Sequence, residues 1–153
     1  MGRAQDLLLR ASETGAELAD VISAAVEPFD SHELRRFVVQ NTLIEIGPGA
    51  ILPLTMSLNE LCTNAVKYGA LSNETGRVNI TSTVDEATQL FTLTWTETGG
   101  PTVQEPTRRS FGTRLLGGLA TQLHGEVRVR YEPAGVVYQL DIPLALLRTL
   151  RAS

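Results

Sequence analysis

The sequence predicts an α/β two-layer sandwich, in which helices cover one face of a mixed β-sheet. Segments whose apolar residues recur at helical spacing are interleaved with pairs of segments whose apolar residues recur at every second position. Elements in this alternating order favour a helix layer packed on a sheet. The 153 residues are enough for one domain with a core, but not comfortably for two.

The composition excludes several classes of protein. Hydrophobic residues make up 42% of the chain and charged residues 20%, as in ordinary globular proteins. The net charge of −4 and the scattered basic residues argue against nucleic acid as a partner. A single cysteine, Cys62, cannot form an internal disulfide, and there is neither a signal-peptide core nor a membrane span of ~20 apolar residues. We expect a cytoplasmic segment without direct membrane contact, although a longer parent protein can still be membrane-bound.

The first clear helix is predicted to begin at Thr14, because residues 14–17 match a capping box. An apolar stripe follows at helical spacing, formed by Leu18, Val21, Ile22 and Ala25, and Pro28 ends it. Residues 1–13 resemble the tail of a preceding dimerisation or linker helix. We therefore divide the chain into that tail and one domain over residues 14–153.

The remaining elements are predicted from periodicity and turn residues. Two short strands are predicted at 36–40 and 43–46, followed by a long helix at 50–68. Two strands at 77–84 and 89–97 and a loop at 98–110 come next. A helix at 113–123 and two strands at 127–131 and 136–142 complete the order. The break before the long helix is the Gly-Pro-Gly sequence at 47–49. His124 and Gly125 are expected to close the helix that precedes them.

The long helix carries a polar face opposite its apolar one. Its core side is predicted to consist of Leu54, Leu58, Leu61, Cys62 and Ala65, with Cys62 chemically inert. Glu60, Asn64 and Lys67 share a narrow sector away from that side. An acid and an amide one turn apart suit a hydrated Mg²⁺ on nucleotide phosphates, and the lysine could meet those phosphates. The alternative is an ordinary solvated face, although the acid and the lysine are not an i,i+4 pair.

Glu97 continues the apolar face of a strand, after Phe91, Leu93 and Trp95. A buried carboxylate needs hydrogen-bond donors, and the exocyclic amine of adenine is one candidate. The residues that follow, Thr98-Gly99-Gly100-Pro101, would let a flat ring approach the backbone. The alternative is an acid at an exposed strand end.

A third segment, Arg108-Arg109-Ser110-Phe111-Gly112-Thr113, leads into the next helix. Free N–H groups at a helix start bind phosphate well, and the arginines could close over such a site. Gly117 and Gly118 lie inside that helix, at a cost of roughly 1 kcal/mol each relative to alanine. Close approach of a neighbour or ligand, or a mobile helix, would explain them.

These three segments, in this order, resemble the N, G1 and G2 boxes of histidine kinase ATPase domains, with HWE histidine kinases and their near relatives most similar. Residues 58–71 resemble the N box, residues 95–101 the Trp-x-Glu G1 box, and residues 108–115 the G2 segment. The likeness extends from about residue 14 to residue 143. It implies a Bergerat-type ATP-binding fold of the GHKL superfamily.

The resemblance also implies a role for each matching residue. Asn64, with Glu60, would hold Mg²⁺, and Glu60 would orient or activate the acceptor imidazole. Lys67 would neutralise phosphate charge and Glu97 would bind the adenine amine. The other residues implied to contact ATP are Tyr68, Gly99, Gly100, Arg108, Arg109, Phe111, Gly112 and Thr113. The implied partners are a histidine-bearing dimerisation domain, a homodimer in the full-length protein, and a cognate response regulator.

Two departures from the pattern matter. Asn59 stands where the HWE N box has histidine, which leaves the subfamily open. The phosphoacceptor box is missing, and we interpret His32 as a look-alike, because the 27 residues between it and Glu60 leave no room for a second dimerisation helix and the first strands. Two alternatives to a histidine kinase fragment remain, an anti-sigma-type serine kinase and a degenerate nucleotide-binding regulatory module.

Overall fold

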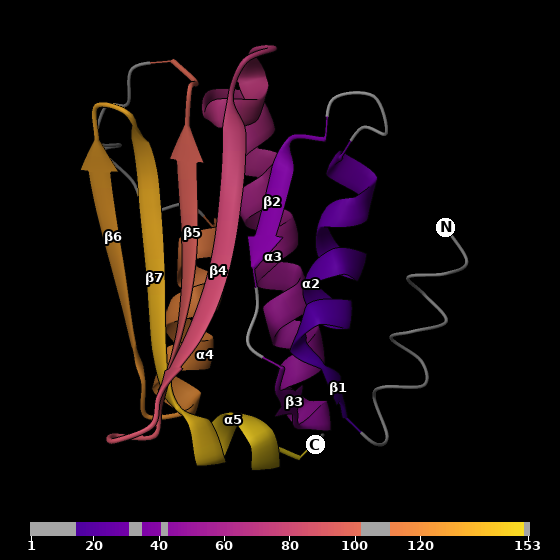
Figure 1. Cartoon of the computed structure of the whole chain (residues 1–153), viewed down its shortest axis with the longest axis vertical. Coiled ribbons are helices and arrows are strands. Elements are labelled where there is room, and N and C mark those ends of the chain that lie inside the picture. Colours follow the sequence, from indigo (N-terminus) through magenta and orange to yellow (C-terminus); the bar gives the residue numbers. More distant parts are fainter. Residues whose placement is uncertain (1–14, 31–34, 41–42, 102–110, 152–153) are drawn as a thin grey trace.

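The computed structural model describes residues 15–30, 35–40, 43–101 and 111–151. The elements are labelled in Figure 1 and are, in chain order, β1 (Ala16–Glu17), α2 (Leu18–Val26), β2 (Phe37–Gln40), β3 (Glu45–Ile46), α3 (Pro48–Tyr68), β4 (Arg77–Asp85), β5 (Leu90–Thr98), α4 (Phe111–Gln122), β6 (Glu126–Glu132), β7 (Gly135–Pro143) and α5 (Leu144–Thr149). Short 3₁₀ turns, Glu27–Phe29 and Ala70–Ser72, follow α2 and α3. The predicted tail over residues 1–13 lies outside the described residues.

The main sheet has five strands in the order β2-β4-β5-β7-β6. β2 runs parallel to β4, and the other neighbours are antiparallel. The long helix α3 therefore lies in the crossover between two parallel strands, as parallel pairing requires. The predicted mixed sheet is confirmed.

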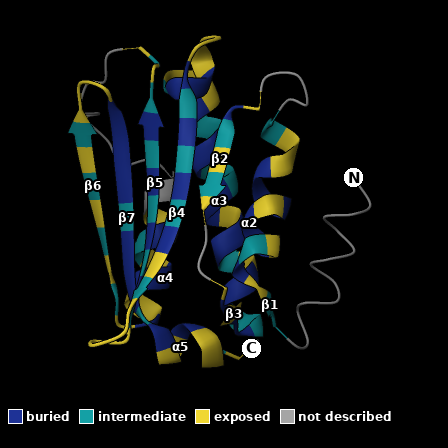
Figure 2. Ribbon diagram, in the orientation of Figure 1, coloured by how far each residue is buried: buried dark blue, intermediate teal, exposed yellow. Residues whose placement is uncertain are grey.

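The helices α3 and α4 lie behind the sheet in Figure 1 and α2 lies beside the β2 edge, and α3 packs against both of the others. The core between the two layers includes Leu18, Ile22, Leu54, Leu58, Leu61, Ile80, Phe91, Trp95, Leu123 and Ile142, each at most 2% exposed. Each such side chain contributes about 1.5–3 kcal/mol through burial. Exposed residues lie on α2, α4, α5 and the edge strand β6 (Figure 2). The predicted two-layer sandwich, with helices on one face, is confirmed.

The start of the first described helix differs from the prediction. Ala16 and Glu17 form β1, which pairs with Ile46 and Glu45 of β3, and α2 begins only at Leu18. The N-cap residue Glu17 makes no side-chain cap hydrogen bond. The predicted capping box is wrong because pairing with a distant strand satisfies this stretch of backbone, whereas the capping pattern considers local partners alone.

The helix α5 was not predicted, and it supports the start of α3. The N–H groups of Gly47 and Gly49 donate to the carbonyl oxygens of Leu147 and Leu150, both at 2.9 Å. The first N–H groups of a helix have no partner within it, so the C-terminal segment supplies part of what a capping side chain would otherwise supply. In the part of the chain that the structure describes, no helix is long and apolar enough to cross a membrane.

Candidate functional site

The polar face predicted for α3 lies on the helix side away from the core. All five residues predicted for the core side are buried, whereas Glu60 and Asn64 are half-buried and Lys67 is exposed. Successive residues of a helix rise by ~1.5 Å, so the carboxylate, the amide and the amine come from consecutive turns. Their side chains are open to a ligand, and their contact with one stays a prediction.

Glu97 is buried, at 3% exposure, so the alternative of an exposed strand-end acid is excluded. Its Oε1 atom accepts a hydrogen bond from the backbone N–H of Ala70 at 2.9 Å, and its Oε2 atom accepts one from the indole N–H of Trp95 at 3.0 Å. Burial raises the pKa of the Glu97 carboxyl, and the two hydrogen bonds oppose this shift. A carboxylate has about four acceptor positions, so it retains capacity for a ligand donor.

The turn after α3 lies directly against Glu97. Gly69 caps the helix and lies directly against the Glu97 carboxylate, where a Cβ atom would collide with Oε1. Asn64 precedes Gly69 by five residues, or ~7.5 Å along the helix axis. Glu97 therefore lies at the C-terminal end of α3, and that it shares one ligand site with Glu60, Asn64 and Lys67 stays a prediction.

Gly99 and Gly100 pack against the backbone of the chain itself. A Cβ atom on Gly100 would lie 2.6 Å from the Cα atom of Ala70, and one on Gly99 would lie 3.0 Å from the carbonyl oxygen of Thr75. The φ angle of Gly99 is also +74°, in the left-handed region that favours glycine. These contacts already require small residues here, and contact of either glycine with a nucleotide stays a prediction.

Sequence reasoning missed Arg36, whose side chain is buried beside this turn. Its guanidinium donates to the carbonyl oxygens of Ala70 at 2.7 Å, Gly76 at 3.0 Å and Leu71 at 3.5 Å. In the sequence it was placed only as the first residue of the predicted strand at 36–40. Its partners are 34 to 40 residues away, so no local spacing pattern could have revealed them.

Two neighbours of Glu60 on α3 have structural roles. The amide of Asn59 donates to the carbonyl oxygen of Ala25 at 2.6 Å and so ties α3 to α2. Cys62 is fully buried, and burial raises the pKa of its thiol far above the ordinary value. The thiolate, the reactive form, is therefore disfavoured, which supports the prediction of an inert cysteine, and the predicted position of Cys62 on the core side is confirmed.

The helix α4 begins within the predicted phosphate-binding segment. Phe111, Gly112 and Thr113 form its first turn, whereas Arg108 and Arg109 lie outside the described residues. At its other end the N–H of Gly125 donates to the carbonyl oxygen of Ala120 at 2.7 Å, and His124 has a φ of +57°. This geometry is a Schellman C-cap, so the predicted closure of the helix by His124 and Gly125 is confirmed.

None of the described residues outside α4 lies close to the two glycines inside this helix. A Cβ atom on Gly117 or Gly118 would have nothing within 4 Å outside its own helix. Close packing against the described residues therefore does not explain either glycine. Approach of a ligand or partner and mobility of the helix are the two explanations that remain from the sequence.

We expect Gly118→Ala to stabilise the domain by about 1 kcal/mol, because alanine removes the backbone entropy cost of a helical glycine and meets no obstacle. The melting temperature should rise by roughly 2–4 °C for a domain of this size. Calorimetry without nucleotide checks this. A fall in stability would contradict it and would show that α4 is not a continuous helix at this position.

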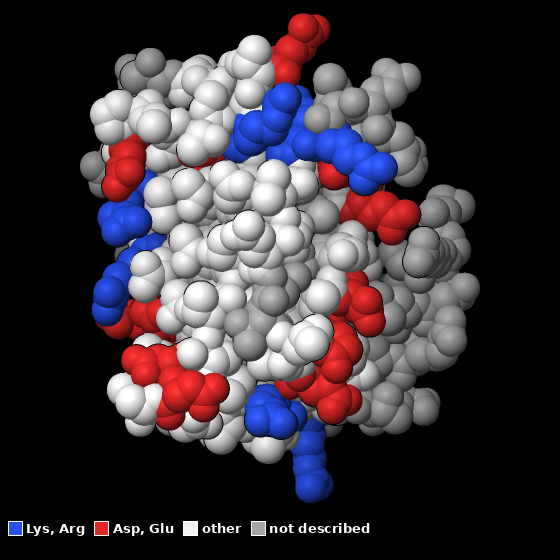
Figure 3. Space-filling view, in the orientation of Figure 1, with Lys and Arg blue, Asp and Glu red and all other residues white. Residues whose placement is uncertain are grey.

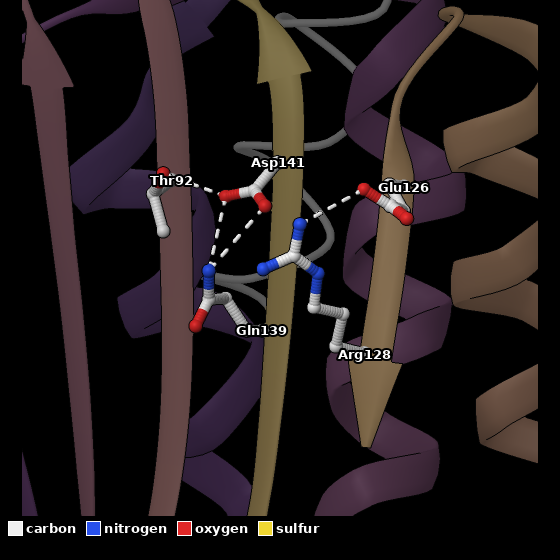
Figure 4. Close-up of polar contacts among 5 residues, drawn as sticks. All are labelled: Thr92, Glu126, Arg128, Gln139 and Asp141. Atoms are coloured by element: carbon white, nitrogen blue, oxygen red, sulfur yellow. Dashed lines mark hydrogen bonds and ion pairs between the residues drawn. The ribbon is translucent and has the colours of Figure 1, made fainter.

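The other face of the sheet has a satisfied polar network rather than a second site. Asp141, 8% exposed, accepts hydrogen bonds from Thr92 Oγ1 at 2.7 Å and from the amide of Gln139 at 3.3 Å (Figure 4). Arg128 pairs with Glu126 at 3.1 Å, and both side chains are exposed. Figure 3 looks onto this face, whose centre is largely uncharged, with charged side chains at its margins. An exposed ion pair such as that of Arg128 with Glu126 contributes little to stability.

No protein-family model matches the chain. Individual proteins do match it. A blue-light-activated histidine kinase of Brucella anthropi is 37% identical over 147 residues, which cover 94% of this chain and 30% of that protein. A protein of the same description from Brucella ovis is 35% identical over the same shares. The chain thus spans about 30% of the length of these curated relatives.

Solved structures agree with the fold. The histidine kinase domain of the Erythrobacter litoralis EL346 blue-light activated histidine kinase has a TM-score of 0.69 at 19% identity, over 95% of this chain and 73% of that one. The catalytic domain of the histidine kinase ThkA has a TM-score of 0.61 at 18% identity, over 85% of this chain and 95% of that one. The fold is that of histidine kinase catalytic domains, the GHKL fold.

Sequence relatives and fold agree with each other. The chain is similar over nearly its whole length to a segment of blue-light-activated histidine kinases, and it has the fold of histidine kinase catalytic domains. The predicted resemblance to histidine kinase catalytic domains is confirmed.

Proposed function

We propose that this domain binds ATP with Mg²⁺ and transfers the γ-phosphoryl group to a histidine on a dimerisation domain. Glu60 orients or activates the acceptor imidazole, Asn64 holds the metal, and Lys67 neutralises phosphate charge. Glu97 accepts the adenine amine. Phosphoryl transfer depends on positioning and charge stabilisation more than on covalent chemistry by the protein, which suits this set of groups.

The observation that carries the proposal is the position of Glu97 at the end of α3. The buried carboxylate is held by the N–H of Ala70, two residues after the end of the helix whose free face presents Glu60, Asn64 and Lys67. A purine-binding acid and a phosphate-binding face must lie about one nucleotide apart, and Asn64 precedes Gly69, which lies against Glu97, by ~7.5 Å along the helix axis. The relatives named as histidine kinases support the same proposal.

The donor set fits a magnesium ion carried by the nucleotide. Among the described residues no group of three or more His, Cys, Asp or Glu side chains could hold a metal ion. Mg²⁺ keeps several waters and is usually bound through one or two protein oxygens plus substrate phosphates. Asn64 and Glu60 offer such a partial set, so the metal would arrive with ATP.

Several finer points belong to the same proposal. The domain would work in the cytoplasm within an HWE-type kinase or a near relative, with ADP as product and a response regulator as the next acceptor. The segment that follows β5 and the first turn of α4 would enclose the phosphates through Arg108, Arg109, Phe111, Gly112 and Thr113, while Tyr68, Gly99 and Gly100 would line the nucleotide.

The test is to incubate the domain with labelled ATP and Mg²⁺ and a separately purified acceptor-helix protein. Acid-labile label on histidine supports the proposal. Acid-stable label on serine would favour the anti-sigma type of kinase, and nucleotide binding without transfer would favour a regulatory module.

Asn64→Ala should remove the Mg²⁺-dependent part of the ATP affinity, because the amide is the group proposed to hold the metal. We expect a loss of about tenfold or more in the presence of Mg²⁺, and little change in its absence. Titration calorimetry with and without the metal measures both. An unchanged affinity with Mg²⁺ would refute the metal assignment.

A further inference from the structure

The strongest unassigned feature is the buried guanidinium of Arg36. It lies at the N-terminal end of β2 and reaches across to the segment between α3 and β4. Its three hydrogen bonds go to the backbone carbonyl oxygens of Ala70, Leu71 and Gly76, at 2.7, 3.5 and 3.0 Å. No carboxylate in the described part of the chain forms an ion pair with it; the ion pairs found there involve other arginines.

This use of a charge is costly for a purely structural contact. Burying a guanidinium removes its hydration, and neutral carbonyl groups replace only part of it. Apolar packing would stabilise the core at least as well. However, the planar fork of an arginine can bind several carbonyl oxygens at once, which fixes their relative positions. The geometry therefore points to a positional role for the Gly69–Gly76 segment.

Ala70 connects Arg36 to the proposed adenine-binding acid. The carbonyl oxygen of Ala70 accepts from Arg36, and the N–H of the same residue donates to Oε1 of Glu97. The neighbouring Gly69 lies against the same carboxylate. Displacing Ala70 would therefore withdraw a donor from Glu97 and change which directions of the carboxylate remain open to a ligand.

Arg36 is itself held at its backbone. Its N–H donates to Oδ1 of Asp30 at 2.8 Å, just before β2. Its carbonyl oxygen accepts from the N–H of Val78 in β4 at 3.0 Å. A side chain anchored in this way on the sheet can hold a surface turn in place.

We propose that Arg36 is a positioning residue of the nucleotide site. It holds the turn after α3 so that the Ala70 N–H keeps the Glu97 carboxylate in the orientation that accepts the adenine amine. This inference rests on the proposed function. It adds a residue that touches neither nucleotide nor metal, and whose loss acts on purine affinity through Ala70.

The chain provides both a reporter and a control for this proposal. Trp95 is the single tryptophan, and its indole N–H donates to Oε2 of Glu97, so the NMR signal of that N–H reports on the carboxylate. Arg77 is the matched control, since its guanidinium binds the carbonyl oxygens of Thr75 and Gly76 in the same segment but not that of Ala70.

The experiment compares Arg36→Lys, Arg36→Met and Arg77→Ala by calorimetric titration with ATP and Mg²⁺, well below each variant's melting temperature. We expect both Arg36 variants to bind ATP roughly tenfold or more weakly, with the lysine less affected, and to shift the indole signal of Trp95. Arg77→Ala should stay within about twofold, without a shift. If Arg36→Met does not fold, Arg36→Lys carries the comparison.

A merely structural arginine would lower the unfolding free energy of the variants and leave the ATP affinity of the folded fraction unchanged, with an unmoved Trp95 signal. That outcome would overturn the inference while the proposed function stands. If the unaltered domain itself does not bind ATP, the proposed function fails, and the inference fails with it.

Discussion

Glu60→Gln should lower phosphoryl transfer to the acceptor histidine by roughly 10²–10⁴-fold, the range that a positioned general base contributes. Glutamine keeps the length of the side chain and a hydrogen-bonding oxygen but cannot take up a proton at neutral pH. Because the side chain is half-buried on the free face of α3, the substitution should leave the fold unaffected. Single-turnover transfer of labelled phosphate, with the acceptor protein in excess, measures the effect.

The same variant separates two roles proposed for Glu60. If it acts on the imidazole alone, the affinity for ATP with Mg²⁺ stays within about twofold of the original. A fall in affinity that parallels the loss in transfer would instead make Glu60 mainly a metal ligand. Glu86→Gln is the matched control, because it makes the same chemical change on an exposed residue in the turn after β4. Transfer by this control should be unchanged.

Periodicity predicted the elements that pack across the two layers. The alternation in β5 places Phe91, Leu93, Trp95 and Glu97 on its buried side, and all four are buried. The apolar sector of α3 was predicted for the same reason, since the 3.6-residue repeat decides which residues can reach the sheet. These patterns are local, and local spacing is what a single sequence contains.

Pairing between distant strands could not be predicted in this way. The segments at 36–40 and 43–46 are adjacent in sequence, yet β2 pairs with β4 and β3 pairs with β1. Short strands carry too few residues to specify a partner, so tertiary packing decides. α5 was missed for a related reason, because six residues give less than two helical turns and hence no period to detect.

The sequence predicted Glu97 and the polar face of α3 as parts of the candidate site, but it did not predict the groups that hold Glu97 in position. Glu97 was detectable because a carboxylate on an apolar face needs donors. The two groups that donate hydrogen bonds to Glu97 could not be predicted in the same way. The N–H of Ala70 is a backbone group, which no residue type reveals, and Trp95 was assigned to the apolar face by the alternation of the strand, without a hydrogen-bonding role. The role of Arg36 became visible only through its three-dimensional contact with Ala70.

Glu97→Ala should weaken ATP binding by roughly 10- to 150-fold, which corresponds to the loss of a hydrogen bond to a charged group, and should nearly abolish the preference for ATP over GTP. Adenine presents an amine where guanine presents a carbonyl oxygen, and only the amine can donate to the carboxylate. Competition between the two nucleotides, measured in one titration series, gives the preference directly. Equal preference before and after the substitution would remove Glu97 from adenine recognition.

Glu97→Gln is the control that isolates the charge of this acid from its shape. Burial raises the pKa of Glu97, so the native state binds a proton more tightly than the unfolded state does. The contribution of Glu97 to stability is therefore fully present below about pH 4.5, the ordinary pKa of a glutamate side chain. It is lost as the pH rises through the raised pKa of the folded state. The unfolding free energy of the original chain minus that of Glu97→Gln should fall over this window and then level off, because glutamine does not titrate. A difference that instead increases with pH would mean that the hydrogen bonds from Ala70 and Trp95 outweigh burial, and that the pKa of Glu97 in the folded state lies below its unfolded value.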